Sequence, residues 1–103
     1  MVATIKENLQ AVLGLCVKYN VRTLEVFGSA IDDRRFDESG SDLDFLVEFL
    51  PMEPVDHARS YFGFLEELKS LFDRSVDLVE AKAIKNPYFL EAINKEREQI
   101  YAA

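Results

Sequence analysis

The chain has 103 residues and a mass of 11.8 kDa, the usual size of one domain, so we expect a single core over residues 1–103. A hydrophobic content of 49%, with eight Phe and four Tyr, argues against an intrinsically disordered chain. A net charge of −7 disfavours the broad basic surface of a nonspecific nucleic-acid binder, so no direct nucleic-acid binding is expected.

The N-terminal segment is predicted to be one amphipathic helix. Apolar residues recur at helical spacing from Ile5 to Cys16, with Thr4 placed to cap the helix and Tyr19-Asn20 to end it. Cys16, the single cysteine, has no partner for an intramolecular disulfide, which favours a reducing compartment. The sequence shows neither a secretion signal nor eighteen consecutive apolar residues, so we expect a soluble, cytoplasmic protein without membrane contact.

A short strand and an exposed loop are predicted next. Residues 23–27 are rich in β-forming side chains, and Gly28-Ser29 directly after them is typical of a strand that runs into a tight turn. Residues 32–41, which include Glu38, are polar and charged, so we expect them to form an exposed loop.

The middle of the chain is predicted to form a strand and a long helix. Residues 43–49 alternate between apolar and mostly acidic positions, which indicates a strand with one face toward the core. Over residues 57–73 apolar side chains recur every three or four positions, which predicts a second helix with Asp56 as its N-cap.

The C-terminal part is predicted to contain a strand over residues 75–79 and a further helix. Asn86-Pro87 is typical of a helix cap followed by proline in the first turn, and the residues up to Tyr101 are compatible with a helix. The order of these elements predicts an α+β, two-layer fold: a small mixed β-sheet with helices on one face and acidic residues on the other.

Two aspartates at the start of an apolar strand are the first candidate site residues. Aspartate is depleted in strands, and the spacing of Asp42 and Asp44 puts both carboxylates on one face, where they repel each other unless a cation or proton intervenes. Such carboxylates suit Mg²⁺, which completes its coordination with water and substrate phosphates. On the pair alone, the simpler interpretation of two solvated side chains stays open.

Gly28-Ser29 and Asp77 extend this candidate site. A glycine lets a phosphate approach the backbone closely and a serine adds a hydroxyl group, although the same pair also occurs in ordinary turns. Asp77 adds a third carboxylate from the predicted strand over residues 75–79. A phosphate-binding turn, a metal-binding pair and a further carboxylate on one face suit phosphoryl or nucleotidyl transfer to a hydroxyl group.

Three segments together resemble the minimal nucleotidyltransferases of the DNA polymerase β-like superfamily: Val26-Phe27-Gly28-Ser29, Gly40-Ser41-Asp42-Leu43-Asp44-Phe45-Leu46-Val47-Glu48-Phe49 and Val76-Asp77-Leu78-Val79. A later segment is similar to the C-terminal helix of that family: Asn86-Pro87-Tyr88-Phe89 with Glu96 and Ile100-Tyr101. The resemblance covers nearly the whole chain. It implies one minimal nucleotidyltransferase domain over residues 1–103 with a fold like the polymerase β palm.

The resemblance also implies roles for individual residues. Gly28 and Ser29 are expected to bind the nucleotide phosphates. Asp42, Asp44 and Asp77 are expected to be the catalytic, metal-binding residues, with Asp77 also helping to deprotonate the acceptor hydroxyl. The implied cofactor is Mg²⁺, as two ions, and the implied substrate is ATP.

The sequence departs from this family after the turn. Many relatives carry an arginine soon after Gly-Ser, whereas the first basic residues here are Arg34 and Arg35. The twelve residues between Ser29 and Asp42 also make this loop slightly longer than is usual. Arg34-Arg35 either reaches phosphates or belongs to a charged surface loop.

Two functions from different classes remain open. The resemblance implies metal-dependent transfer of a nucleoside monophosphate, AMP from ATP, to a hydroxyl group, with a tyrosine of a partner HEPN-type toxin as acceptor and this chain as antitoxin. The alternative is a non-catalytic antitoxin that inhibits its partner by occlusion, for which a net charge of −7 suits a basic partner surface.

The remaining candidates have simpler interpretations. His57, the single histidine, is expected to be exposed in the first turn of its helix. Lys82 and Lys85 are expected either to be solvated or to approach the open face. Three aromatic residues are expected to be core or interface residues rather than a platform for base stacking: Tyr61, Phe62 and Phe64.

Overall fold

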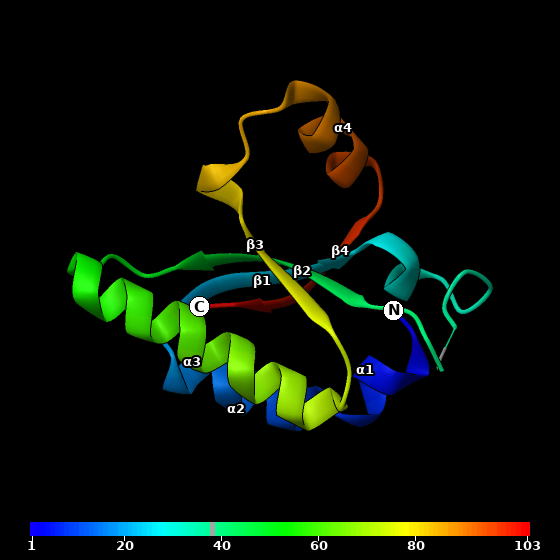
Figure 1. Ribbon diagram of the computed structural model, residues 1–103, viewed down its shortest axis with the longest axis horizontal. Coiled ribbons are helices and arrows are strands. Elements are labelled where there is room, and N and C mark those ends of the chain that lie inside the picture. The colour runs from blue at the N-terminus through cyan, green and yellow to red at the C-terminus, as the bar shows by residue number, and fades with distance from the viewer. Residues whose placement is uncertain (38) are drawn as a thin grey trace.

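A computed structural model describes residues 1–37 and 39–103; Glu38, in the predicted loop, lies outside the described residues. The elements in chain order are α1 (Ala3–Glu7), α2 (Leu9–Lys18), β1 (Val21–Phe27), the 3₁₀ turn η1 (Gly28–Ile31), β2 (Leu43–Phe49), α3 (Pro54–Phe72), β3 (Val76–Glu80), η2 (Ala81–Ala83), α4 (Pro87–Lys95) and β4 (Arg97–Ala102). The strands form one mixed sheet in the order β3-β2-β1-β4 (Figure 1). Strand β1 is antiparallel to β2 and β4, and β2 is parallel to β3.

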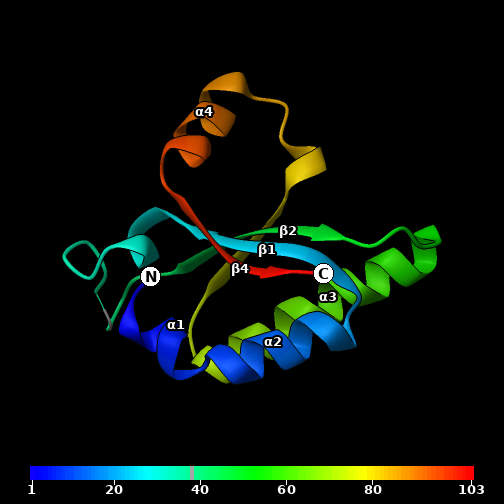
Figure 2. The same ribbon diagram turned by 180° about the vertical axis from the view of Figure 1, so that it is seen from behind.

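The main core lies between the sheet and three of the helices. Helices α1, α2 and α3 lie on one side of the sheet, and α4 lies on the other (Figures 1 and 2). Helix α3 contributes Phe64 and Leu68, both fully buried. The predicted apolar face of β2 is confirmed, because four alternate side chains point into this core: Leu43, Phe45, Val47 and Phe49.

The predicted N-terminal helix is two helices separated at Asn8. The Asn8 side-chain amide donates a hydrogen bond to the carbonyl oxygen of Thr4 at 2.8 Å, and its backbone leaves the helical region. Asparagine competes for backbone groups in this way, so the helix breaks although the apolar spacing continues. Thr4 does not cap the helix, because α1 begins at Ala3 after Val2. Cys16 is buried, and burial raises the pKa of its thiol to about 12.

Helix α3 begins earlier than predicted. Its first residue is Pro54 and its N-cap position is Glu53, so Asp56 lies within the first turn and is not the cap. Proline suits the first helical position because its missing N–H has no intrahelical partner and its φ is already helical. The helix ends at Asp73, which adopts the left-handed conformation with φ 49°.

The largest correction concerns the C-terminal segment. The Asn86 side chain caps α4 as predicted and accepts hydrogen bonds from the N–H groups of Tyr88 and Phe89. The predicted helix up to Tyr101 is wrong, however, because α4 ends at Lys95 and the chain then forms β4 along β1. The local sequence of β4 does not favour a strand by itself. Pairing with β1, which is distant in the sequence, makes this segment a strand.

Helix α4 covers part of the face that was expected to be open. Ile93 is 2% exposed and packs against Phe27 and Leu46 in a second, smaller cluster. The prediction that helices cover one face only is therefore wrong, whereas the α+β fold with a mixed sheet is confirmed. None of the helices in the described part of the chain has the length and apolar character needed to span a bilayer.

Candidate active site

The three predicted carboxylates lie at one end of the sheet. Asp44 and Asp77 occupy the same register position on the parallel strands β2 and β3. Both point away from the main core, because side chains alternate along a strand and Leu43 and Val76 point into it. Asp44 is half-buried, Asp77 is exposed, and Asp42 is exposed just before β2 begins.

Asp44 lies in an environment that disfavours its charge. Partial burial raises the pKa of Asp44 to about 6, together with a hydrogen bond shared with Asp77 and the negative charges of Asp77 and Asp42. Both neighbouring acids therefore act electrostatically on Asp44. Below pH about 6 a proton on Asp44 relieves this repulsion, and above it a bound cation would do so.

Gly28 brings the backbone of a tight turn against this carboxylate. Its φ of +73° is rarely adopted by other residues, and a Cβ atom at this position would lie 2.5 Å from Oδ2 of Asp44. The predicted turn after β1 is confirmed as η1, in which Ser29 is half-buried and Ala30 is fully buried. The turn and the carboxylate pair thus form one continuous surface.

The carboxylate oxygens of these side chains are suitable ligands for a hard cation. In the part of the chain that the structure describes, no three His, Cys, Asp or Glu side chains gather closely enough to hold a metal ion. The site is therefore an Asp44–Asp77 pair with Asp42 nearby, and a shared cation requires these side chains to turn inward. Their oxygen donors, mutual repulsion and exposure suit Mg²⁺, which leaves coordination positions for water and phosphate.

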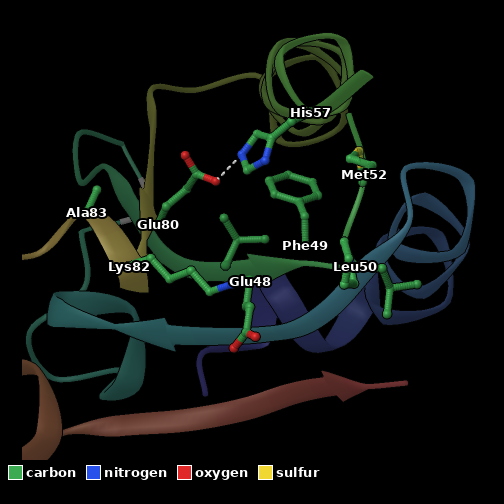
Figure 3. A pocket seen from close by; sticks show the side chains of 10 residues that line it. Glu48, Phe49, Leu50, Met52, His57, Glu80, Lys82 and Ala83 are labelled. Carbon is green, nitrogen blue, oxygen red and sulfur yellow. Dashed lines mark hydrogen bonds and ion pairs between the residues drawn. The ribbon is translucent and has the colours of Figure 1, made fainter. Parts of the chain in front are cut away.

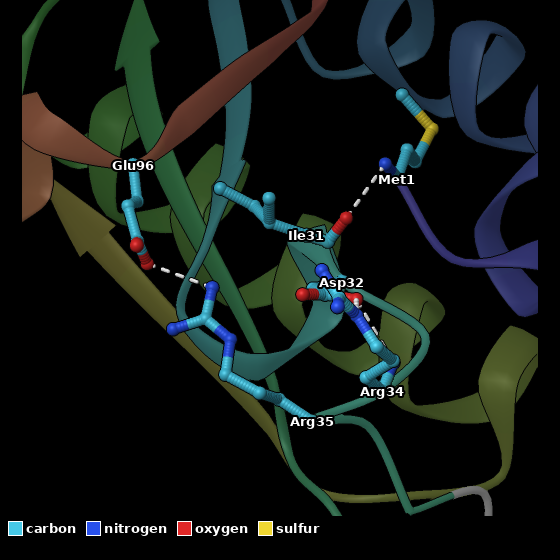
Figure 4. A network of polar contacts seen from close by, with 6 residues as sticks. All are labelled: Met1, Ile31, Asp32, Arg34, Arg35 and Glu96. Atoms are coloured by element: carbon cyan, nitrogen blue, oxygen red, sulfur yellow. Dashed lines mark hydrogen bonds and ion pairs between the residues drawn. The ribbon is translucent and has the colours of Figure 1, made fainter.

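The two arginines after the turn are each held by an acid (Figure 4). Nε of Arg34 lies 3.5 Å from Oδ1 of Asp32, and the Arg34 side chain is 91% exposed. Nη2 of Arg35 lies 2.7 Å from Oε2 of Glu96, the residue that follows α4. Arg34 therefore belongs to the charged surface loop, whereas Arg35 joins that loop to the end of α4.

Arg74 lies close to Asp42 and was not singled out by the sequence. Its Nη1 donates a hydrogen bond to the carbonyl oxygen of Ser41 at 3.1 Å, and its guanidinium lies 4.9 Å from the centroid of the Phe36 ring. Arg74 and Asp42 line one cavity of about 250 Å³. No spacing pattern in the sequence connects the turn before β3 with the loop before β2, so only the folded chain shows this neighbour.

A larger cavity, of about 370 Å³, lies at the opposite end of β2 (Figure 3). His57 contacts Glu80 beside it and packs against the ring of Phe49. The prediction that His57 is exposed near the start of its helix holds in part: the side chain is 42% exposed, but it is also held between α3, β2 and β3. Lys82 lines this cavity, away from the aspartate pair.

The predicted aromatic core residues separate into two groups. Phe64 is fully buried, and the Tyr61 hydroxyl donates a hydrogen bond to the carbonyl oxygen of Leu78 at 2.6 Å, so both support the core. Phe62 is exposed on the same helix. Lys85 is also exposed, in the segment that leads to α4.

Known sequences similar to this chain share one kind of name. Residues 10–103 match the family model described as Polymerase beta, Nucleotidyltransferase. Over 79 residues the chain is 37% identical to MJ0128 of Methanocaldococcus jannaschii, provisionally named a protein adenylyltransferase; the match covers 77% of this chain and 76% of that protein. MJ1379 of the same organism, named in the same way, is 32% identical with the same coverage.

Solved structures share the fold. A provisionally named minimal nucleotidyltransferase is 30% identical with a TM-score of 0.65, and the match covers 92% of this chain and 91% of that one. A toxin–antitoxin structure with AMP-PNP has a TM-score of 0.68 at 17% identity, covering 93% and 74%. A tri-AMPylated Shewanella oneidensis HEPN toxin in complex with MNT antitoxin has a TM-score of 0.64 at 16% identity, covering 95% and 72%.

Proposed function

Because this chain belongs to the polymerase β nucleotidyltransferase family and is a nucleotidyltransferase, we propose that it transfers AMP from ATP to a hydroxyl group of a separate protein. The observation that carries this proposal is the Asp44–Asp77 pair on β2 and β3 with the Gly28 backbone against it. Two relatives support the choice of nucleotide and acceptor. MJ0128 bears the name of a protein adenylyltransferase, and one structural neighbour contains AMP-PNP.

In this proposal the turn after β1 binds the phosphates. Gly28 has no Cβ atom, so a phosphate can approach the backbone beside Asp44, and Ser29 offers an N–H and a hydroxyl donor. Asp42, Asp44 and Asp77 would hold Mg²⁺ through their carboxylate oxygens. Two such ions would supply positive charge for the phosphates and for the acceptor oxygen.

The transfer itself is an in-line displacement. The acceptor oxygen attacks the α-phosphorus, the bond from that phosphorus to the bridging oxygen breaks, and pyrophosphate leaves. Asp77 is exposed and accepts the proton of the acceptor hydroxyl. Asp44 has to be ionised to bind a cation, so the cation and the proton compete for this carboxylate.

We propose a tyrosine of a HEPN-type toxin as the acceptor, with this chain as its antitoxin. The HEPN toxin in one structural neighbour is itself tri-AMPylated and bound to an antitoxin. Asp42 and Asp77 are exposed, so a separate protein can present a hydroxyl group to them. The net charge of −7 also favours a partner with a basic surface.

Mass spectrometry of a HEPN-type partner tests the reaction directly. After incubation with this protein, ATP and Mg²⁺, the partner should gain the mass of one or more adenylate groups on a tyrosine. Asp42→Ala, Asp44→Ala and Asp77→Ala should abolish the adduct, whereas Ser29→Ala should weaken it less because the backbone N–H groups remain. Asp33→Ala is the matched control, since this aspartate is exposed on the loop and should leave transfer unchanged.

The same experiment separates catalysis from occlusion. If the partner is inhibited without an adduct from any of the four nucleoside triphosphates, and the three aspartate variants inhibit it equally well, the chain acts by covering its partner. If the variants still bind the partner but no longer silence it, inhibition depends on transfer.

A further inference from the structure

Arg74 connects the start of β3 to the segment that carries Asp42. Its Nη1 donates a hydrogen bond to the carbonyl oxygen of Ser41 at 3.1 Å. The backbone N–H of Leu43 donates a hydrogen bond to the carbonyl oxygen of Ser75, also at 3.1 Å. The residues on both sides of Asp42 are therefore held by two successive residues of the turn between α3 and β3.

The same guanidinium group also contacts an earlier part of this segment. It lies 4.9 Å from the centroid of the Phe36 ring, a distance at which a cation and an aromatic face attract each other. Hydrogen bonds from Ser39 lower the pKa of Asp37, and the positive charge of Arg74 lowers it further. One side chain thus stabilises several points of the loop that leads to Asp42.

Asp42 needs this support more than the other two carboxylates do. Asp44 and Asp77 lie within paired strands, so the sheet sets their positions. Asp42 is exposed and precedes Leu43, the first residue of β2. Its charge nevertheless acts on Asp44, so the three acids lie within electrostatic reach of one site. A ligand that is already positioned binds a metal ion more tightly, because less conformational freedom is lost on binding.

We propose that Arg74 is a positioning residue that holds Asp42 ready to share a divalent cation with Asp44 and Asp77. It acts through the backbone of Ser41, the residue before Asp42. The inference rests on the proposed function, because it takes Asp42 as a metal ligand. Lysine can replace the charge of Arg74 but not its planar set of donors, which reaches a carbonyl oxygen and a ring together. The shape of the guanidinium group, as well as its charge, should therefore matter.

Binding of Mn²⁺ to the purified protein tests this role without any transfer reaction. Electron paramagnetic resonance measures the free ion during a titration and gives a dissociation constant for each variant. Arg74→Gln should weaken Mn²⁺ binding by roughly tenfold, the lower end of the effect of residues that orient metal ligands. Arg74→Lys should weaken it less. Arg34→Gln is the matched control with unchanged affinity, since Arg34 is 91% exposed on the same loop.

A double-mutant cycle with Asp42→Ala shows whether Arg74 acts through Asp42. In the Asp42→Ala background, Arg74→Gln should leave the remaining Mn²⁺ affinity of the Asp44–Asp77 pair unchanged. Circular dichroism checks that each variant is folded. If Arg74→Gln does not fold, Arg74→Lys takes its place in the cycle, with the same expected result.

Three results would contradict the inference. Unchanged Mn²⁺ affinity in Arg74→Gln, or an equal loss with and without Asp42, overturns the inference and leaves the proposed function standing, because Arg74 then supports only the fold. Equal affinity of the wild type and Asp42→Ala overturns the inference and removes Asp42 from the proposed metal site. A wild-type protein that binds no Mn²⁺ overturns both the inference and that metal site.

Discussion

Asp44 and Asp77 face each other across one strand spacing, at the same register position of the parallel strands β2 and β3. Like charges in direct opposition destabilise a sheet, and the partial burial of Asp44 adds to this cost. The pair therefore weakens the free protein at neutral pH. Such a local cost is expected where a site is arranged for a ligand that supplies the missing positive charge.

Replacement of Asp44 by asparagine should stabilise the free protein at pH 7.5 by on the order of 1–2 kcal/mol. The pKa of about 6 in the folded protein lies above the ordinary value of an aspartate, about 4. Ionisation of Asp44 therefore destabilises the folded protein. This destabilisation is absent below pH ~4, grows as the pH rises and is fully present above pH ~6. Urea denaturation of both proteins at pH 4 and pH 7.5 should show the gain only at the higher pH.

Asp37→Asn is the control of opposite sign for this measurement. Hydrogen bonds from the Ser39 hydroxyl and backbone lower the pKa of Asp37, so its ionised form supports the folded state. The loss of stability of this variant relative to the wild type should be larger at pH 7.5 than at pH 4. Equal stability of Asp44→Asn and wild type at pH 7.5 would show that the aspartate pair imposes no cost.

Divalent metal with nucleotide should reverse the effect of the aspartate pair. Mg²⁺ alone is expected to raise the melting temperature of the wild type slightly, and Mg²⁺ with ATP to raise it more, because water and phosphate supply most ligands of this ion. Asp44→Ala should lose most of the increase. The melting temperatures of both proteins are measured by thermal unfolding over a titration of Mg²⁺–ATP. Identical shifts in melting temperature would show that the Asp44 carboxylate does not bind the metal.

Replacement of Gly28 by alanine should damage both stability and nucleotide binding. The new Cβ atom would meet Oδ2 of Asp44 at 2.5 Å, and the φ of +73° is strained for alanine. A loss of about 1–3 kcal/mol is expected by urea denaturation. Gly14→Ala is the matched control: Gly14 lies inside α2 with open space around its Cβ position, so it should gain about 0.5–1 kcal/mol. Equal effects of the two changes would refute the argument from the turn.

The parts of the fold that depend on local pattern could be predicted from the sequence. The alternation in β2, the turn after β1 and the Asn86 cap of α4 are each encoded within a few residues, and the structure confirms all three. The position of Asp44 beside Asp77 follows from strand pairing, which the resemblance to a known family supplied. The roles assigned to these residues stay predictions.

Features that depend on contacts between distant segments could not be predicted from the sequence. Residues 97–102 begin with the charged Arg97 and Glu98 and are compatible with a helix, and only pairing with the edge of β1 makes them a strand. The same holds for Arg35 and Glu96, since no spacing rule joins two residues that far apart. The contact of His57 with Glu80 could not be predicted for the same reason, because Glu80 lies at the end of β3.

The attachment of α4 to the sheet should depend on Ile93. A helix of nine residues is too short to be stable alone, and Ile93 is the residue of α4 that is buried, against Phe27 and Leu46. Ile93→Ala should therefore increase amide hydrogen exchange across α4 and lower the stability of the protein by about 2–4 kcal/mol, or by less where α4 detaches. Tyr88→Ala, at a side chain that is 82% exposed, should leave exchange unchanged.

Hydrogen exchange measured by mass spectrometry compares α4 with α3 in each variant. Faster exchange in α4 alone supports a helix held at one contact, whereas equal acceleration in α3 would mean that the smaller cluster belongs to the main core.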